Sequence, residues 1–241
     1  MAERVFEIMT EASSHPLKPY PETAQVAYLS LLAGLCFADK DFGDKERQQL
    51  ETHLNALGIS SEGRGKVYSA VFDLRDEHIE AITDGLLKLQ NSDLRFTLIS
   101  DLYVIALADD KITDEEDSYI KELARQVKIS AEQCATIRTV QINIKRASEI
   151  PPASDRYKEI LKDSAARLAS VSVPIAAIAA SGSVFGLSAA GLTSGLAALG
   201  AIVGGGMLAG TVLVVPALAV GAAYGTKKLI NLAFRSKSKP V

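Results

Sequence analysis

The feature that most constrains this chain is a stretch of 59 consecutive residues, 168–226, without any Lys, Arg, Asp or Glu. Residues 1–167 hold 21 basic and 29 acidic residues, a net charge of −8, whereas residues 227–241 carry five bases and no acid. A helix that is apolar all round must be covered by protein or lipid. The sequence therefore predicts a helical domain at 1–150, a linker and lead-in helix at 151–167, an uncharged hydrophobic hairpin at 168–226 and a basic tail at 227–241.

The length of the uncharged block fits two membrane crossings. As a helix, 59 residues would extend about 88 Å, whereas the hydrocarbon core of a bilayer is about 30 Å thick. Two placements of the turn are open: 191–195, with spans near 168–190 and 196–218, or 204–206, with spans near 184–203 and 207–224. The basic tail favours the cytoplasmic side, and the N-terminus lacks an apolar signal run. We expect both termini on the cytoplasmic side of a bacterial-type inner membrane.

Glycine is concentrated in this block, which holds 11 of the 17 glycines of the chain. In water each interior glycine costs a helix about 1 kcal/mol relative to alanine. In lipid, glycines spaced four residues apart let helix backbones pack closely. This pattern predicts packing and self-assembly through Gly182, Gly186, Gly191, Gly195, Gly200, Gly204, Gly206 and Gly210. By composition the block resembles the hydrophobic hairpin of pore-forming colicins and the glycine-rich segment of small interferon-inducible membrane proteins.

The basic tail adds a second membrane signal. Near an anionic leaflet each base contributes about 1 kcal/mol of attraction, and the candidate lipid-surface residues are Lys227, Lys228, Arg235, Lys237 and Lys239. A simpler interpretation is a positive flank without lipid specificity. The alternative for the block itself is a soluble hairpin that is buried within a homo-oligomer, in which case the protein is cytoplasmic.

The first 150 residues have the apolar spacing of an all-α bundle of six to eight helices. Apolar residues recur at helical intervals, as in Leu50, Leu54 and Leu57. Turns are expected at 58–65 and near Asn91. The segment also repeats itself, because FADKDFGDKE at 37–46 aligns without a gap on LADDKITDEE at 107–116. The offset of 70 residues extends outward, so two copies of one helix-loop-helix unit build this domain, with an internal pseudo-twofold relation.

These two Ala-Asp-x-x-(Phe/Ile)-x-Asp-x-Glu loops resemble those of the TerB-like family, which is named for a tellurite-resistance operon. The resemblance covers about residues 20–145. It implies a compact helical domain tied to stress responses and membrane-linked complexes, with an acidic surface as a suggested metal site. The glycine that usually follows Ala-Asp in the family is replaced here by Lys40 and Asp110.

The acidic loops have two interpretations. Converging carboxylates suit Ca²⁺ or Mg²⁺, and the candidate ligands are Asp39, Asp41, Asp44, Glu46, Asp109, Asp110, Asp114 and Glu116. Neither loop is an EF-hand, because position twelve counted from Asp39 is Leu50. The alternative is helix capping by Asp44, or by Thr113 and Glu116 as a Thr-x-x-Glu capping box, which requires no ligand.

Several classes of protein do not fit the sequence. The acidic head lacks the clustered bases of a nucleic-acid-binding domain. Two cysteines make no disulfide framework, and Cys36 and Cys134 are expected as reduced, buried thiols. The three histidines are scattered, with His53 expected on a helix surface, and no catalytic constellation or phosphate loop is visible.

The sequence therefore predicts a non-enzymatic, membrane-associated stress or defence protein. Its cytoplasmic TerB-like head would sense a signal or dock a protein partner, and its hairpin would contact membrane lipid and assemble as a homo-oligomer. The alternative is a soluble oligomeric interaction scaffold whose acidic head binds partners or divalent ions.

Overall fold

The computed structural model describes residues 15–36, 38, 43–73, 76–88, 93–151 and 154–182. The helices are α2 (Glu22–Leu35), α3 (Asp44–Leu57), α4 (Ser61–Asp73), α5 (Asp76–Lys88), α6 (Leu94–Ala106), α7 (Asp114–Gln126), α8 (Ala131–Ser148), α9 (Asp155–Ser170) and α10 (Ile175–Gly182). The described residues contain no strand, which confirms the all-α prediction. Seven helices, α2–α8, lie in the described part of residues 1–150, where six to eight were expected.

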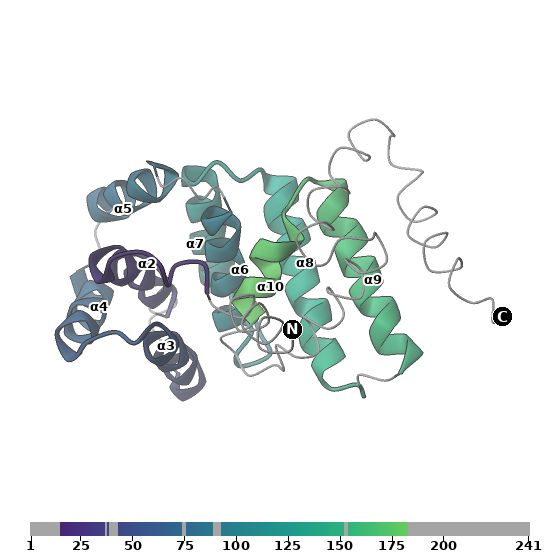
Figure 1. The fold of residues 1–241 in the computed structure, drawn as a ribbon. Coiled ribbons are helices and arrows are strands. Elements are labelled where there is room, and N and C mark those ends of the chain that lie inside the picture. Colours follow the sequence, from purple (N-terminus) through teal and green to yellow (C-terminus); the bar gives the residue numbers. More distant parts are fainter. Residues whose placement is uncertain are drawn as a thin grey trace, which may run out of the picture.

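The internal repeat is visible in where the helices begin. α3 and α7 start at Asp44 and Asp114, and α4 and α8 start at Ser61 and Ala131. Each pair of starts is 70 residues apart, as the sequence offset predicts, and α2 and α6 are the corresponding first helices. In Figure 1, α2–α5 form one end of the molecule, α8–α10 form the other, and α6 and α7 lie between them.

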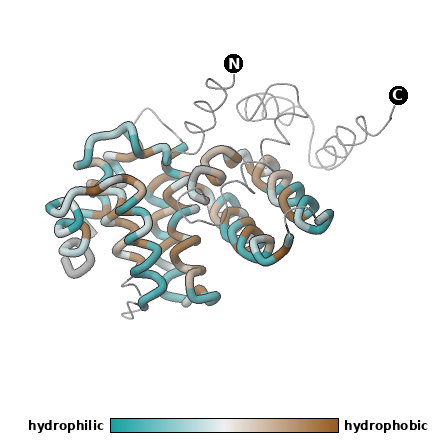
Figure 2. Tube along the Cα trace, turned by 60° about the horizontal axis from the view of Figure 1, so that its bottom comes forward, coloured by the Kyte–Doolittle hydropathy of each residue, from teal (hydrophilic) through white to brown (hydrophobic). Residues whose placement is uncertain are grey.

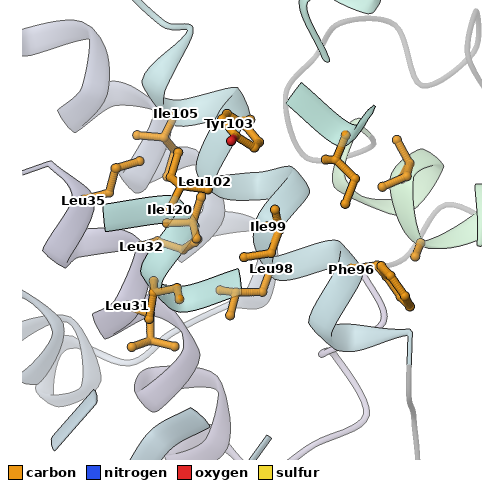
Figure 3. Close-up of a cluster of buried hydrophobic side chains, with 14 of the residues drawn as sticks. Leu31, Leu32, Leu35, Phe96, Leu98, Ile99, Leu102, Tyr103, Ile105 and Ile120 are labelled. Atoms are coloured by element: carbon orange, nitrogen blue, oxygen red, sulfur yellow. The ribbon is translucent and has the colours of Figure 1, made fainter. Parts of the chain in front are cut away.

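The core is built on α2 and α6, which are the most apolar helices of the two copies. Every residue of α6 except Arg95 is buried. Leucines and isoleucines from α2, α6 and α7 meet in the cluster of Figure 3, which includes Leu31, Leu32, Ile99 and Ile120. Apolar residues line the inner faces of the helices and hydrophilic residues their outer faces (Figure 2), as amphipathic helices around a shared core require.

One local expectation was right only in part, and another was wrong. The glycine-containing stretch 58–65 is a turn only at its start, where Gly58 ends α3 with φ of 72°, a conformation that glycine adopts at little cost. Gly63 and Gly65 lie within α4. His53 is not on a helix surface, because its side chain is completely buried. The two cysteines are buried and form no disulfide, as predicted.

The folded unit continues past the boundary predicted at residue 150. Helix α9, expected as a linker and lead-in helix, begins after Ser154, whose Oγ accepts a hydrogen bond from the Tyr157 amide at 3.2 Å. Its inner face is buried against the core cluster through Tyr157, Leu161 and Leu168. The chain then turns at 171–174 and enters α10, which packs on α6. The first residues of the uncharged block, 168–182, therefore belong to the folded head.

Candidate functional site

The first acidic loop is described only from Gly43 onward, so Asp39 and Asp41 lie outside the described residues. Gly43, not Asp44, is the N-cap of α3, which corrects the expected capping role of Asp44. Asp44 is the first residue of the helix, and its exposed carboxylate lies 4.0 Å from the guanidinium of Arg47. The buried carboxylate of Glu46 accepts a hydrogen bond from the Gly43 amide at 2.9 Å. Glu46 therefore satisfies a backbone donor at the helix start.

The second acidic loop contains the predicted capping box. Thr113 Oγ1 accepts from the Glu116 amide at 3.2 Å, and Glu116 Oε2 accepts from the Thr113 amide at 2.7 Å. Glu116 is buried. Asp114, the first residue of α7, is exposed in a helix turn where negative charge is favourable.

Asp109 and Asp110 hold the backbone turn that leads into this capping box. Asp109 Oδ1 accepts from the Lys111 amide at 3.1 Å. Asp110 has φ of 73°, in the left-handed region that glycine adopts most easily and that aspartate tolerates. Its carboxylate lies 2.6 Å from Lys145 Nζ, and this hydrogen-bonded ion pair holds the pKa of Asp110 below its ordinary value. The same ammonium group donates to the carbonyl of Leu107.

Within the described part of the chain, no group of three or more His, Cys, Asp or Glu side chains is arranged to hold a metal ion. Glu46, Glu116, Asp109 and Asp110 have carboxylates that already bind the backbone or Lys145. The capping interpretation is thus supported for Thr113 and Glu116, and Ca²⁺ or Mg²⁺ binding stays a prediction.

Removing the cap tests this interpretation. We expect Thr113→Ala to lower the free energy of unfolding by about 1 kcal/mol, because the Glu116 amide loses its acceptor. Thermal unfolding of the full chain without Ca²⁺ measures this loss of stability, and the same experiment with Ca²⁺ measures any stabilisation by the ion. If Ca²⁺ raised the melting temperature of the parent chain and Asp109→Ala abolished that increase, the loop would be a metal site.

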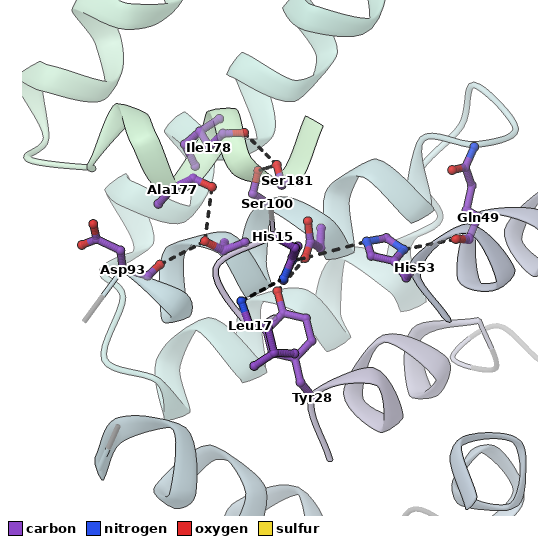
Figure 4. Close-up of polar contacts among 12 residues, drawn as sticks. His15, Leu17, Tyr28, Gln49, His53, Asp93, Ser100, Ala177, Ile178 and Ser181 are labelled. Atoms are coloured by element: carbon purple, nitrogen blue, oxygen red, sulfur yellow. Dashed lines mark hydrogen bonds and ion pairs between the residues drawn. The ribbon is translucent and has the colours of Figure 1, made fainter. Parts of the chain in front are cut away.

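The most unusual group in the described residues is a buried polar cluster, formed by His15, Tyr28, His53 and Asp101 (Figure 4). It joins the segment before α2 to α2, α3 and α6. Asp101 Oδ2 lies 2.6 Å from the Tyr28 hydroxyl, 3.0 Å from His15 Nε2 and 3.8 Å from His53 Nε2. Asp101 Oδ1 is buried and has no hydrogen-bond partner among the described residues.

The cluster keeps Asp101 ionised although it is fully buried. Burial alone disfavours the carboxylate, but hydrogen bonds and attraction from His15 and His53 outweigh that cost and hold the pKa of Asp101 well below its usual range. Burial, together with the negative charge of Asp101, raises the pKa of Tyr28 well above its ordinary value. Tyr28 is therefore a stable hydrogen-bond donor at neutral pH.

A second polar cluster lies between α6, α8 and α10, next to the first cluster (Figure 4). Ser100 Oγ lies 2.6 Å from Ser181 Oγ and accepts from Gln141 Nε2 at 2.5 Å. Thr97 Oγ1 donates to the carbonyl of Ala177 at 3.2 Å. All of these side chains are buried, so α10 is held on the head both by packing and by hydrogen bonds between buried polar groups.

Sequence reasoning missed both buried clusters. One signal was available for the first, because Asp101 is the only charged residue between Arg95 and Asp109, in an apolar helical run. An acid there must be buried and must have partners. Its partners His15 and His53 are 86 and 48 positions away, and no spacing rule connects them.

Of the predicted glycine sites, Gly182 ends α10, and those from Gly186 to Gly210 lie outside the described residues, as do the five bases from Lys227 to Lys239.

Comparison with known proteins supports the resemblance seen in the duplicated loops. The chain matches no curated protein and no solved structure. Residues 25–139 match the family described as tellurite resistance protein TerB. This segment begins in α2 and ends in α8, and so includes both copies of the helix-loop-helix unit. The head of this chain is therefore a TerB domain.

Proposed function

We propose that this protein is a non-enzymatic, membrane-associated stress protein, in which the TerB domain anchors and orients a two-span hairpin formed by residues 183–226. The observation that carries the proposal is the docking of α10 in the head. The uncharged block does not leave the domain at residue 168, because residues 168–182 are part of the fold. The hairpin would then start at a fixed place and direction on the head.

The contacts of α10 support a fixed exit. Ala177, Ile178 and Ala179 are buried. The turn before α10 is held as well, since Gln133 Nε2 donates to the carbonyl of Val171 at 3.0 Å. Ser172 has φ of 57°, so the chain reverses between α9 and α10 and does not continue as one helix.

This docking favours one of the two placements of the turn. A first span at 168–190 would require most of its residues to leave the head. The 44 residues from 183 to 226 would extend about 66 Å as helix, enough for two crossings of about 30 Å. We therefore favour spans near 184–203 and 207–224 with the turn at 204–206, followed by the basic flank that begins at Lys227. Among the described helices none is both long and apolar enough to cross a membrane, and the proposed spans lie outside them.

A charge scan of the full-length protein tests the placement. We expect Ser194→Lys and Leu213→Lys to reduce membrane insertion, because a lysine at the centre of a span costs about 2.5–3.5 kcal/mol. Gly205→Lys, in the proposed turn, is the matched control and should leave insertion unchanged. Carbonate-resistant pelleting measures insertion. If Ser194→Lys were tolerated and Gly205→Lys were not, the turn at 191–195 would be correct.

The second candidate function is a soluble oligomeric scaffold. The same docking favours it, because the head already covers part of the uncharged block with protein. In this case the remaining block would be covered by other copies of the chain. Recovery of the full-length protein in the soluble fraction without detergent, as a defined oligomer, would support the scaffold and contradict the membrane proposal.

A further inference from the structure

Helix α10 is held on α6 by apolar packing and by polar contacts between uncharged groups (Figure 4). Ile178 is buried, Thr97 Oγ1 donates to the carbonyl of Ala177, and Ser100 Oγ lies 2.6 Å from Ser181 Oγ. Residues 168–226 carry no charge. Separation of α10 from α6 therefore transfers no charged group of α10 to a new environment.

The hydroxyl groups in this contact also have partners on their own side of it. Ser181 Oγ donates at 2.8 Å to a carbonyl of α10 itself, so this hydrogen bond moves with the helix. Thr97 Oγ1 lies 3.3 Å from the carbonyl of Asp93, one turn earlier in the chain. Ser100 keeps its donor from α8, Gln141. Release of α10 thus avoids the cost of leaving these hydroxyls without a partner, and a serine bonded to its own helix is tolerated in lipid.

Helix α10 is also continuous with the rest of the uncharged block. Its apolar side chains must be covered, and both α6 and lipid can cover them. With α10 on the head, the turn of the hairpin at 204–206 is favoured. With α10 released, residues 175–182 become available to the first span, and the earlier turn at 191–195 becomes possible.

We propose that α10 is a releasable segment for which the head and the membrane compete. In the docked state the hairpin begins at residue 183, and in the released state α10 becomes part of the first span. Any interaction that stabilises the docked head then draws α10 out of the bilayer, so the TerB domain controls how the hairpin is inserted. This inference rests on the proposed membrane function, and the experiment below distinguishes the failure of one from the failure of the other.

A disulfide between α6 and α10 holds the docked state for the test. Because their hydroxyl oxygens are 2.6 Å apart, Ser100→Cys and Ser181→Cys place two sulfurs within bonding reach. Cys36→Ala and Cys134→Ala remove the two natural thiols. Mass spectrometry of the oxidised full-length protein verifies the disulfide, and dithiothreitol opens it.

A single introduced tryptophan reports where α10 lies, since the chain has none of its own. Ala176→Trp is on the half-buried side of α10, and Leu213→Trp is in the second span of either placement. Both are reconstituted in phosphatidylcholine–phosphatidylglycerol vesicles whose acyl chains carry bromine, which quenches tryptophan fluorescence in the hydrocarbon core. We expect Leu213→Trp to be quenched in both states of the disulfide, and Ala176→Trp to be quenched only when the disulfide is open.

The outcomes separate the two proposals. If Ala176→Trp stayed bright with the disulfide open while Leu213→Trp was quenched, release would be wrong and the membrane hairpin would stand. Equal quenching of Ala176→Trp with the disulfide closed would also overturn release, because α10 would reach the bilayer without leaving α6. A bright Leu213→Trp would contradict the membrane function itself.

A change in the head tests the competition without engineered cysteines. Thr97→Val keeps the shape of the side chain and the sequence of α10, but removes the hydrogen bond to the carbonyl of Ala177. Loss of one such bond should shift the equilibrium toward release by roughly two- to tenfold and so increase quenching of Ala176→Trp. The matched control is Thr139→Val, whose exposed hydroxyl bonds only within α8. Equal quenching in the two variants would overturn the competition.

Discussion

Asp101→Asn is expected to lower the free energy of unfolding by about 3–5 kcal/mol, although it changes neither the size nor the shape of the side chain. The amide oxygen can still accept from Tyr28 and His15, so the hydrogen bonds at 2.6 and 3.0 Å need not be lost. The negative charge that strengthens these two hydrogen bonds is lost, and the amide nitrogen would be buried at the position of Oδ1, which has no hydrogen-bond partner among the described residues, so the combined cost is of this order. Urea unfolding of the full chain at pH 7 measures it.

The pH dependence of unfolding, compared between the parent and this variant, shows whether ionisation of Asp101 stabilises the fold. The pKa of Asp101 is lower in the folded protein than its ordinary value, so its ionisation stabilises the fold above the unfolded-state pKa, which is about 4. That contribution is lost as the pH falls below about 4 toward the lower folded-state value. The parent should therefore lose stability over this range more steeply than Asp101→Asn. Parallel acid profiles would contradict an ionised Asp101.

Ile178→Asp is expected to detach α10 from the head. Ile178 is buried on the inner side of α10 and belongs to the hydrophobic core cluster. An unpaired buried charge costs several kcal/mol unless the segment moves into water. Detachment would expose Ser100 and Thr97, and amide exchange of α6 and α10 should increase at least tenfold.

The control for this change is Ala176→Asp on the same helix, where the side chain is only half-buried. It adds the same charge without placing it in the core, so exchange of α6 should stay near that of the parent. Equal exchange in the two variants would show that α10 is not held by its buried face. If α10 fixes the exit of the hairpin, Ile178→Asp should also alter its insertion, measured by carbonate-resistant pelleting.

The sequence alone predicted the features that can be read from short segments of the chain. The repeat was found because FADKDFGDKE and LADDKITDEE are similar at a fixed offset, and the helices begin 70 residues apart as that offset requires. The Thr113–Glu116 capping box was predicted for the same reason, since its two residues are three positions apart. Composition also located the uncharged block, although it placed the boundary of the head too early.

The position of α10 and the buried polar cluster around Asp101 were decided only by tertiary structure. Residues 168–182 are as uncharged as those that follow, and hydropathy cannot tell whether protein or lipid covers an apolar segment. The docking of α10 depends on hydrogen bonds from Thr97 and Ser100, which lie about 80 residues earlier in the chain. His53 looked like a surface residue because helix α3 is mostly polar, and only the packing of α3 against α6 brings its ring to Asp101. Periodicity shows which face of a helix is apolar, whereas the pairing of buried charges depends on which helices meet.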